Sequence, residues 1–355
     1  MTEWRADVLG DGFSCTDLEL GSDEEGPLTA TLVRSLPQRP PLFERLLGRR
    51  RPLDGVDVLY VHGWSDYFFQ RHLAEFWTSR GARFFALDLR KYGRSLRPGQ
   101  TPGYIEHLDD YDLELGLAHD VIRAEAGADP TRKLVLLGHS TGGLVLSLWA
   151  ARHPGRADAL ILNSPWLEFQ LSAAGRQVIA PLVALSARFM PKDVAPQLDY
   201  GFYTRAQREV GPQDELAVID PQWRPERSHG VSTAWLRAIL AGHERVNHGL
   251  GLTIPVAVLL SERSAVPLRW SDDLVRADTV LDVEAVARAA LRLGSSVTIE
   301  RIPGGLHDLF LSAPGPRAEA YARLHRWLIG WRAETAMEPP LSAAPEGAGR
   351  DRLGS

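Results

Sequence analysis

The sequence predicts an α/β protein with a mostly parallel β-sheet flanked by helices. Short apolar runs of strand length alternate along the chain with segments whose apolar residues recur at helical spacing. Such alternation is typical of parallel sheets covered on both faces. Polar residues also follow several of the apolar runs, where active residues gather in folds of this class. Among them are His62, Asp88, Ser140 and Asn163.

The first half of the chain supplies most of the expected core. Weak strand patterns around Ser14–Leu20 and Leu28–Ser35 predict a β-hairpin. Compact apolar runs then predict strands at Val56–Val61, Arg83–Leu89, Leu134–Leu137 and Ala157–Leu162. Apolar residues at helical spacing predict helices at Tyr67–Arg80, Asp110–Ala126 and Leu144–Ala151.

The alternation of strand and helix patterns stops after residue 165. Several amphipathic helical patterns and many aromatic residues between Trp166 and Gly251 predict a helical insertion over the sheet. Alternation then resumes, with strands expected at Ile254–Leu260 and Ser296–Ile302 and helices at Val283–Leu293 and Arg317–Arg332. The last residues are rich in Pro, Ala, Gly and Ser, which predicts a disordered tail. The expected organisation is a core of residues 1–165 and 252–335, an insertion at 166–251 and a tail at 336–355.

The composition is that of an ordinary globular protein. Of 355 residues, 44% are hydrophobic and 24% are charged, so the chain can bury a sizeable core. The net charge of −5 provides no basic field that would favour nucleic acid. Cys15 is the only cysteine, which suits a reducing compartment. No apolar stretch approaches the ~18 residues of a membrane span and no secretory pattern opens the chain, so we expect a cytoplasmic protein.

The strongest functional signal is a Gly-x-Ser-x-Gly motif between a predicted strand and a predicted helix. Gly138, Ser140 and Gly142 form the motif. On so tight a turn the serine hydroxyl is pushed out of the chain, and glycines are needed because a Cβ would clash at the bend. The N–H of Thr141, at a helix N-terminus, then points to where an oxyanion would form. The motif predicts the nucleophile elbow of a serine hydrolase.

A serine nucleophile needs a base, and the base needs an acid to orient it. His307 lies just beyond the last predicted strand, and we expect it to be the base. The acid is expected between the Ile254–Leu260 strand and His307. Asp278, on a loop before a helical run, is the first choice. Asp282 is the alternative, although it is also placed to cap the helix predicted at Val283–Leu293.

A second oxyanion donor is expected from the loop after an earlier strand. His62-Gly63-Trp64-Ser65 follows the strand at Val56–Val61, and the Trp64 backbone N–H is the expected donor. His62 could be taken for a catalytic base. Its place beside the oxyanion turn favours instead a structural role, in which it fixes the loop by hydrogen bonding.

Four motifs in this order resemble the α/β-hydrolase superfamily. Within it, the chain is similar to the branch of monoacylglycerol lipases, lysophospholipases and serine aminopeptidases, over about residues 25–335. Ala277-Asp278-x-x-x-Asp282 also resembles the segment around that branch's acid, but the run Ser261–Arg276 makes it unusually distant from the preceding strand. The four motifs are Leu59-Tyr60-Val61-His62-Gly63, Leu87-Asp88 through Gly93-Arg94-Ser95, Gly138-His139-Ser140-Thr141-Gly142-Gly143 and Gly305-Leu306-His307.

The resemblance implies an α/β-hydrolase fold in which residues 166–251 form a cap that selects the substrate. Val178, Ile179 and Leu182 are the candidate cap residues for lining an acyl pocket; the alternative is that they pack the cap against the core. The expected activity is hydrolysis of carboxylic esters of hydrophobic acyl groups, through an acyl-enzyme and without a cofactor; the expected partner is a small acyl ester. A thioesterase, acyltransferase or aminopeptidase would use the same triad, and a non-hydrolytic ligand-binding protein of this fold is the alternative from another class.

One motif resembles a zinc site. The segment from His243 to His248 is similar to H-E-x-x-H but spaces its histidines five residues apart. On a helix this places them about 140° apart, so they do not share one metal ion from one face. We therefore expect no metal site.

Overall fold

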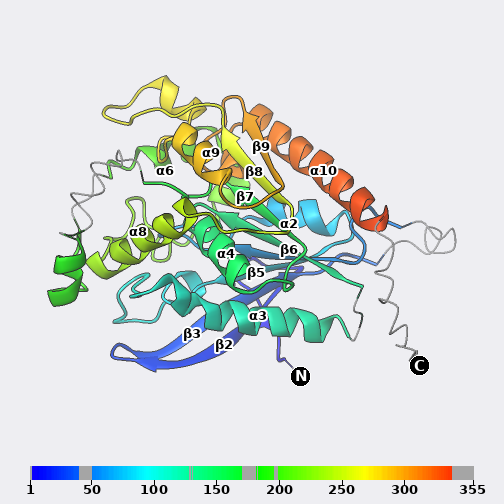
Figure 1. The fold of residues 1–355 in the computed structure, drawn as a ribbon, viewed down its shortest axis with the longest axis horizontal. Helices are drawn as coiled ribbons and strands as arrows, with labels where there is room; N and C mark the ends of the chain where they lie inside the picture. The colour runs from blue at the N-terminus through cyan, green and yellow to red at the C-terminus, as the bar shows by residue number, and fades with distance from the viewer. Residues whose placement is uncertain are drawn as a thin grey trace, which may run out of the picture.

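The computed structural model describes residues 2–39, 50–127, 129, 131–169, 181, 183–195 and 199–337. In these residues, the strands form one nine-stranded mixed sheet (Figure 1). The strands are β1 (Arg5–Ala6), β2 (Phe13–Asp23), β3 (Gly26–Ser35), β4 (Val56–Val61), β5 (Arg83–Asp88), β6 (Lys133–His139), β7 (Ala159–Asn163), β8 (Val256–Ser261) and β9 (Val297–Ile302).

The order of the strands across the sheet is β1-β2-β3-β5-β4-β6-β7-β8-β9. Every pairing from β5 to β9 is parallel, whereas β1, β2 and β3 join antiparallel at one edge. The predicted α/β class with a mostly parallel sheet is therefore confirmed, and so is the N-terminal hairpin. The helices are α2 (Arg71–Thr78), α3 (Asp112–Glu125), α4 (Thr141–Arg152), α6 (Phe202–Val210), α7 (Gln213–Leu216), α8 (Thr233–Asn247), α9 (Val283–Ala290) and α10 (Pro314–Met337).

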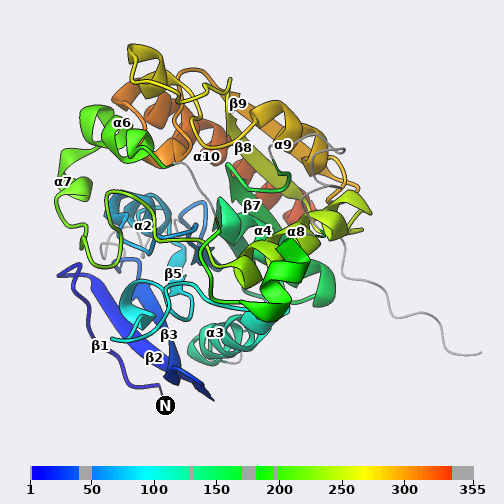
Figure 2. The ribbon, with the colours of Figure 1, turned by 90° about the vertical axis from the view of Figure 1, so that its left-hand side faces the viewer.

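Alternating side chains of the central strands contribute to two apolar cores, one on each face of the sheet. Leu59 and Leu136 face the core covered by α3, α4 and α9. Tyr60 and Leu137 face the opposite core, which α2 and α10 cover. Figure 2 shows α2 and α10 on one side of the sheet and α3, α4 and α9 on the other. Because both faces are covered, the parallel strands are apolar along nearly their whole length.

The prediction of a helix over Tyr67–Arg80 is wrong at its start, since α2 begins only at Arg71. The backbone N–H and carbonyl of Phe68 form long-range hydrogen bonds instead of helical ones. The Phe68 N–H donates to Asp88 Oδ1 at 2.9 Å, and its carbonyl accepts from Arg94 Nη1 at 2.9 Å. The apolar spacing of the segment reflects burial in an extended loop.

The chain between β7 and β8 covers one end of the sheet. It carries α6, α7 and α8, of which α6 and α8 lie at the left-hand side of the molecule in Figure 1. The predicted boundaries of the insertion, 166 and 251, stay a prediction. At the other end of the chain, α10 runs to Met337, two residues into the predicted tail, and the rest of that tail lies outside the described residues.

Candidate active site

Ser140 occupies a sharp turn between β6 and α4. Its φ of 51° and ψ of −119° are unusual for a residue with a side chain, and such strain persists only where the surroundings impose it. The glycines of the motif are required by space. A Cβ on Gly142 would lie 2.4 Å from the carbonyl oxygens of Val61 and His62, and one on Gly138 would lie 2.6 Å from the Gly143 Cα. The turn therefore packs against the strand β4 and the loop that follows it.

Three of the predicted side chains are joined by hydrogen bonds in a row. His307 Nε2 lies 3.0 Å from Ser140 Oγ, and His307 Nδ1 lies 2.9 Å from Asp278 Oδ2. All three residues are buried, with exposed fractions of 8% for Ser140, 3% for His307 and 1% for Asp278. A nucleophile, a base and an orienting acid within hydrogen-bond reach are the geometry that acyl transfer requires.

The two candidate acids have different partners. Asp278 binds the imidazole with Oδ2, while its Oδ1 accepts the backbone N–H groups of Val280 and Leu281, each at 2.8 Å. Asp282 caps α9, because its side chain accepts the N–H groups of Glu284 and Ala285 at 3.0 Å. The structure thus places Asp278, and not Asp282, against His307.

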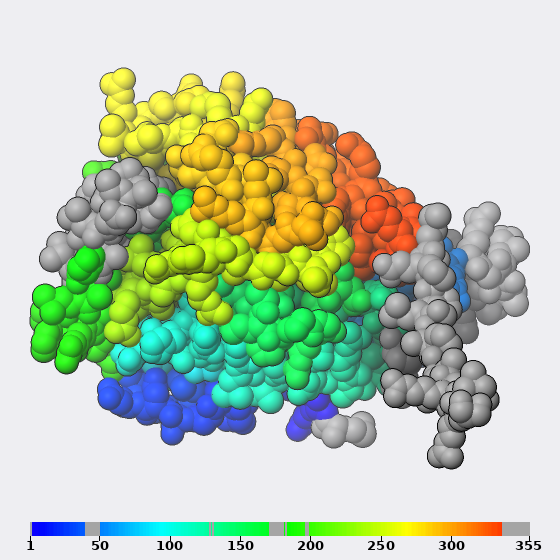
Figure 3. Space-filling view, viewed as in Figure 1, coloured from blue at the N-terminus to red at the C-terminus, as the bar shows by residue number. Residues whose placement is uncertain are grey.

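The long run between β8 and Asp278 folds out of the core and returns to it. Asp278 forms an isolated parallel bridge with Ser264, only three residues after the end of β8. Two backbone bonds fix it there: Asp278 N–H donates to the Arg263 carbonyl, and Ala265 N–H donates to the Asp278 carbonyl. Figure 3 shows the intervening segment, yellow at the top left, projecting beside α9. The acid therefore lies near the strand end in space, although it is distant in sequence.

A second buried aspartate holds the loop that carries His307. Asp308 accepts hydrogen bonds from Asn163 Nδ2 at 2.8 Å, from Gln70 and from the Phe310 N–H at 3.0 Å. Sequence reasoning did not assign this role to Asp308. The only signal was its position next to His307, because its partners come from segments 145 and 238 residues away.

His139, in the elbow motif, lies close to the base without bonding to it. The His139 and His307 rings are 5.0 Å apart between centroids. Burial lowers the pKa of His139, and its Nδ1 lies 3.1 Å from the Asn163 carbonyl oxygen. A neutral imidazole here avoids a second positive charge beside His307 when the latter takes up a proton.

Of the two predicted oxyanion donors, Trp64 lines the same cavity as Ser140 and His307, and Thr141 directly follows Ser140 as the first residue of α4. In the described part of the chain, no hydrogen-bond acceptor is recorded for the N–H of Trp64 or of Thr141. His62 supports the loop as expected. The Leu89 N–H donates to His62 Nε2 at 3.2 Å, which leaves the proton on Nδ1 to be donated to the Gly63 carbonyl at 2.7 Å. His62 therefore holds the loop after β4 by hydrogen bonds on both ring nitrogens.

Ser140, His307 and Trp64 line a cavity of about 690 Å³ between the core and the helices that cover it. Its walls also include a buried pair, Asp66 and Arg224, that sequence reasoning missed because the partners lie far apart in the chain. The predicted substrate residues Val178, Ile179 and Leu182 lie outside the described residues. The Trp, Tyr and Phe side chains around the cavity are Trp64, Trp166, Tyr200, Phe202, Tyr203 and Trp235.

Neither a metal cluster nor a spanning helix is found in the parts of the chain that the structure describes. No three His, Cys, Asp or Glu side chains there are grouped so as to ligate a metal ion. Of the helices there, none combines the length and apolar character needed to cross a membrane. The two histidines of the zinc-like motif have other partners: His243 Nε2 lies 2.9 Å from the Trp166 carbonyl oxygen, and His248 Nδ1 lies 2.8 Å from that of Glu244.

Comparison with known proteins places this chain in a family. The family model described as serine aminopeptidase, S33, matches residues 56–313. A monoacylglycerol lipase of Mycolicibacterium smegmatis is 26% identical over 225 residues, which are 62% of this chain and 74% of the relative. Lysophospholipase L2 of Escherichia coli K12 is 36% identical over 81 residues, which are 22% of this chain and 23% of the relative.

Solved structures share the fold. A soluble variant of the monoglyceride lipase of Saccharomyces cerevisiae superposes with a TM-score of 0.63 at 16% identity, covering 93% of this chain and 99% of that one. A monoacylglycerol lipase of Paleococcus ferrophilus gives 0.56 at 20% identity, covering 78% and 94%. The chain therefore belongs to the serine aminopeptidase S33 family of α/β-hydrolases, in the branch that includes monoacylglycerol lipases and lysophospholipases.

Proposed function

We propose that this protein is a serine hydrolase that cleaves carboxylic esters of hydrophobic acyl groups. The observation that carries the proposal is the hydrogen-bonded row of Ser140, His307 and Asp278, of which Ser140 and His307 line the cavity. The names of the relatives, monoacylglycerol lipase and lysophospholipase, support an acyl ester as the substrate. Aromatic walls around the serine favour an apolar acyl chain over a sugar or phosphate ester.

The proposed reaction proceeds through an acyl-enzyme. Ser140 Oγ attacks the ester carbonyl while His307 Nε2 takes the hydroxyl proton. Asp278 holds His307 in the tautomer with Nδ1 protonated and stabilises the imidazolium that forms. The N–H groups of Trp64 and Thr141 donate to the negatively charged oxygen of the tetrahedral intermediate.

Collapse of that intermediate releases the alcohol and leaves the acyl group on Ser140. His307 gives the leaving oxygen its proton, and then takes one from the water that attacks the acyl-enzyme. The second intermediate collapses to the free acid and restores Ser140. No step draws on a redox group or on a bound metal ion, so the residues of this chain supply every proton transfer.

The proposal is tested by the turnover of p-nitrophenyl esters of increasing chain length, a monoacylglycerol and a lysophospholipid. We expect Ser140→Ala to lower kcat by at least about a thousandfold, because only binding and the oxyanion donors would remain. Ser147→Ala is the control, since that serine lies in α4 and its hydroxyl bonds to the Gly143 carbonyl. Equal turnover by wild type and Ser140→Ala would refute the proposal.

A further inference from the structure

The loop that carries the proposed oxyanion donor is held by one segment of the covering region. We call residues 64–67 the oxyanion loop and residues 218–229 the strap. At the start of the loop, Trp64 Nε1 donates to the His229 carbonyl at 3.3 Å. The His229 N–H donates to Ser65 Oγ at 3.0 Å. One residue of the strap therefore fixes two consecutive residues of the loop.

The next contact is a buried ion pair. Arg224 Nε lies 2.7 Å from Asp66 Oδ1, and each side chain is only 8% exposed. Arg224 is itself positioned by Gln207 of α6, whose Oε1 accepts from Arg224 Nη2 at 2.7 Å. A carboxylate buried to this degree depends on its partner, because an unpaired charge would be strongly destabilised there.

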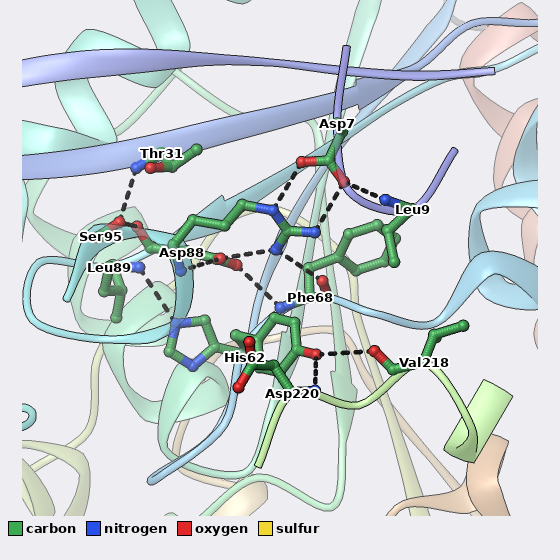
Figure 4. A network of polar contacts seen from close by, with 12 residues as sticks. Asp7, Leu9, Thr31, His62, Phe68, Asp88, Leu89, Ser95, Val218 and Asp220 are labelled. Atoms are coloured by element: carbon green, nitrogen blue, oxygen red, sulfur yellow. Dashed lines mark hydrogen bonds and ion pairs between the residues drawn. The ribbon is translucent and has the colours of Figure 1, made fainter. Parts of the chain in front are cut away.

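The last residue of the loop binds the beginning of the strap. Tyr67 OH accepts the N–H of Asp220 at 2.8 Å and donates to the carbonyl of Val218 at 3.4 Å. Figure 4 shows Val218 and Asp220 beside this contact, with Phe68 and Asp88 of the core on the other side. The core thus holds the chain directly after the loop, while the strap holds the loop itself.

Apolar packing also holds the oxyanion loop, since the Trp64 and Trp235 rings are 4.1 Å apart between centroids and Tyr67 is 1% exposed, but the polar contacts of the loop go to the strap. Every hydrogen bond or ion pair recorded between residues 64–67 and another part of the described chain goes to the strap. Ser65 has a φ of 53°, a left-handed conformation that costs on the order of 1 kcal/mol for a non-glycine residue. Such a conformation persists only when contacts impose it, and the polar contact of Ser65 recorded here comes from the strap.

We propose that the strap sets the oxyanion hole: Arg224, through Asp66, keeps the Trp64 N–H aimed at the developing oxyanion. Arg224 and Asp66 are positioning residues in this account, not substrate ligands. The inference rests on the proposed function, because it requires Trp64 to be an oxyanion donor. It couples catalysis to the docking of the strap, since a strap that is displaced leaves Ser140, His307 and Asp278 in place but removes one oxyanion donor.

The test compares Arg224→Met, Asp66→Asn and the double variant on esters with one acyl group and several alcohols. A misplaced oxyanion donor lowers kcat and leaves KM nearly unchanged. We expect kcat to fall by about 10- to 100-fold, which is a smaller fall than the removal of a whole oxyanion donor causes. The factor should be the same for every alcohol. The double variant should be no slower than the slower single variant, because the two residues act as one unit.

Two further readouts separate positioning from a structural role. Binding of a trifluoromethyl ketone with the same acyl chain should weaken in parallel with kcat/KM, since its serine adduct carries the oxyanion. The pH profile of kcat/KM should keep its position, because His307 and Asp278 are untouched. Tyr67→Phe is a milder variant that removes only the hydroxyl contacts of the loop, and we expect a smaller fall in kcat.

The matched control is Lys192→Met. Lys192 Nζ lies 3.0 Å from Glu25 Oε1, so it also ties the covering region to the core but does not touch the oxyanion loop. We expect wild-type kcat from this variant. A raised KM at constant kcat, or a loss that depends on the alcohol, would overturn the inference and make the pair a substrate site. A kcat loss that tracks Tm and recurs in Lys192→Met would also overturn it. Turnover by Ser140→Ala at the wild-type rate would instead refute the proposed function.

Discussion

At the scale of single residues, the role of a carboxylate depends more on its contacts than on its position in the sequence. Asp278 and Asp282 lie four residues apart, yet one binds the imidazole of His307 and the other caps a helix. The motif in the sequence placed both in the right region and left the choice between them open. The bridge between Asp278 and Ser264 accompanies the contact of Asp278 with His307, and a pairing of this kind has no local signature.

The two aspartates should therefore respond differently to substitution. Asp278→Asn is expected to lower kcat by about 10⁴-fold, because the amide favours the wrong tautomer of His307. Asp282→Ala is expected to keep kcat and to lower the free energy of unfolding by about 1 kcal/mol through the lost cap. Ester kinetics and urea unfolding of both variants measure this. A larger kcat loss in Asp282→Ala than in Asp278→Asn would reverse the assignment.

Other residues of the site were beyond prediction because their partners are distant in the chain. Ser140 and His307 follow from motifs, since a tight turn and a strand end constrain the local sequence. Asp308 and the Asp66–Arg224 pair do not, because each acquires its role only when separate segments meet. Sequence alone thus predicts the reacting groups better than the residues that support them.

At the scale of elements, periodicity located the strands and most of the helices, and long-range bonds set their ends. The strand at Val56–Val61 was predicted to the residue, because a buried parallel strand is a continuous apolar run. The start of α2 was missed, since Asp88 and Arg94 take the backbone groups of Phe68.

The docking of α7 on α2 should make stability depend on pH. Glu215 is 1% exposed, and its Oε1 accepts the His72 N–H at 2.6 Å. Burial raises the pKa of Glu215 to about 7, from an ordinary value of 4.5. Folding therefore favours the protonated carboxyl, so this contribution is fully present below about pH 4.5 and is lost as the pH rises towards 7.

We expect Glu215→Gln to remove that loss. Above pH 7 the variant should gain up to about 3 kcal/mol of unfolding free energy over wild type, and the gain should shrink towards zero near pH 4.5. Urea unfolding at pH 5, 6, 7 and 8 measures the difference. Glu244→Gln, at an exposed position of α8, is the control and should show no such trend. If the unfolding free energies of wild type and Glu215→Gln changed with pH in the same way, the account would be contradicted.

At the scale of the whole molecule, one buried arginine joins three parts of the chain. Arg94 pairs with Asp7 in the N-terminal segment and with Asp88 at the end of β5, and it donates to the Phe68 carbonyl beside the oxyanion loop (Figure 4). Its side chain is 5% exposed. The N-terminal segment is thereby attached to the part of the core that borders the site.

Arg94→Met should be among the most destabilising single changes outside the site. It leaves two buried carboxylates without their partner, and breaking such a pair costs about 3–5 kcal/mol. Arg5→Met removes an exposed ion pair with Asp17 from the same segment and should cost less than about 1 kcal/mol. The measurement is the urea concentration at the midpoint of unfolding for Arg94→Met, Arg5→Met and the wild type. Similar small losses in both would show that the buried network does not join these parts.

The central claim is that Ser140 carries the acyl group during ester cleavage. The most direct test is mass spectrometry of the protein after it is mixed with a p-nitrophenyl ester and quenched in acid within the first turnovers. The account predicts a protein heavier by one acyl group, on the peptide that contains Ser140, and no adduct in Ser140→Ala. Continued turnover with the acyl group on another residue, or an equal adduct in Ser140→Ala, would contradict it.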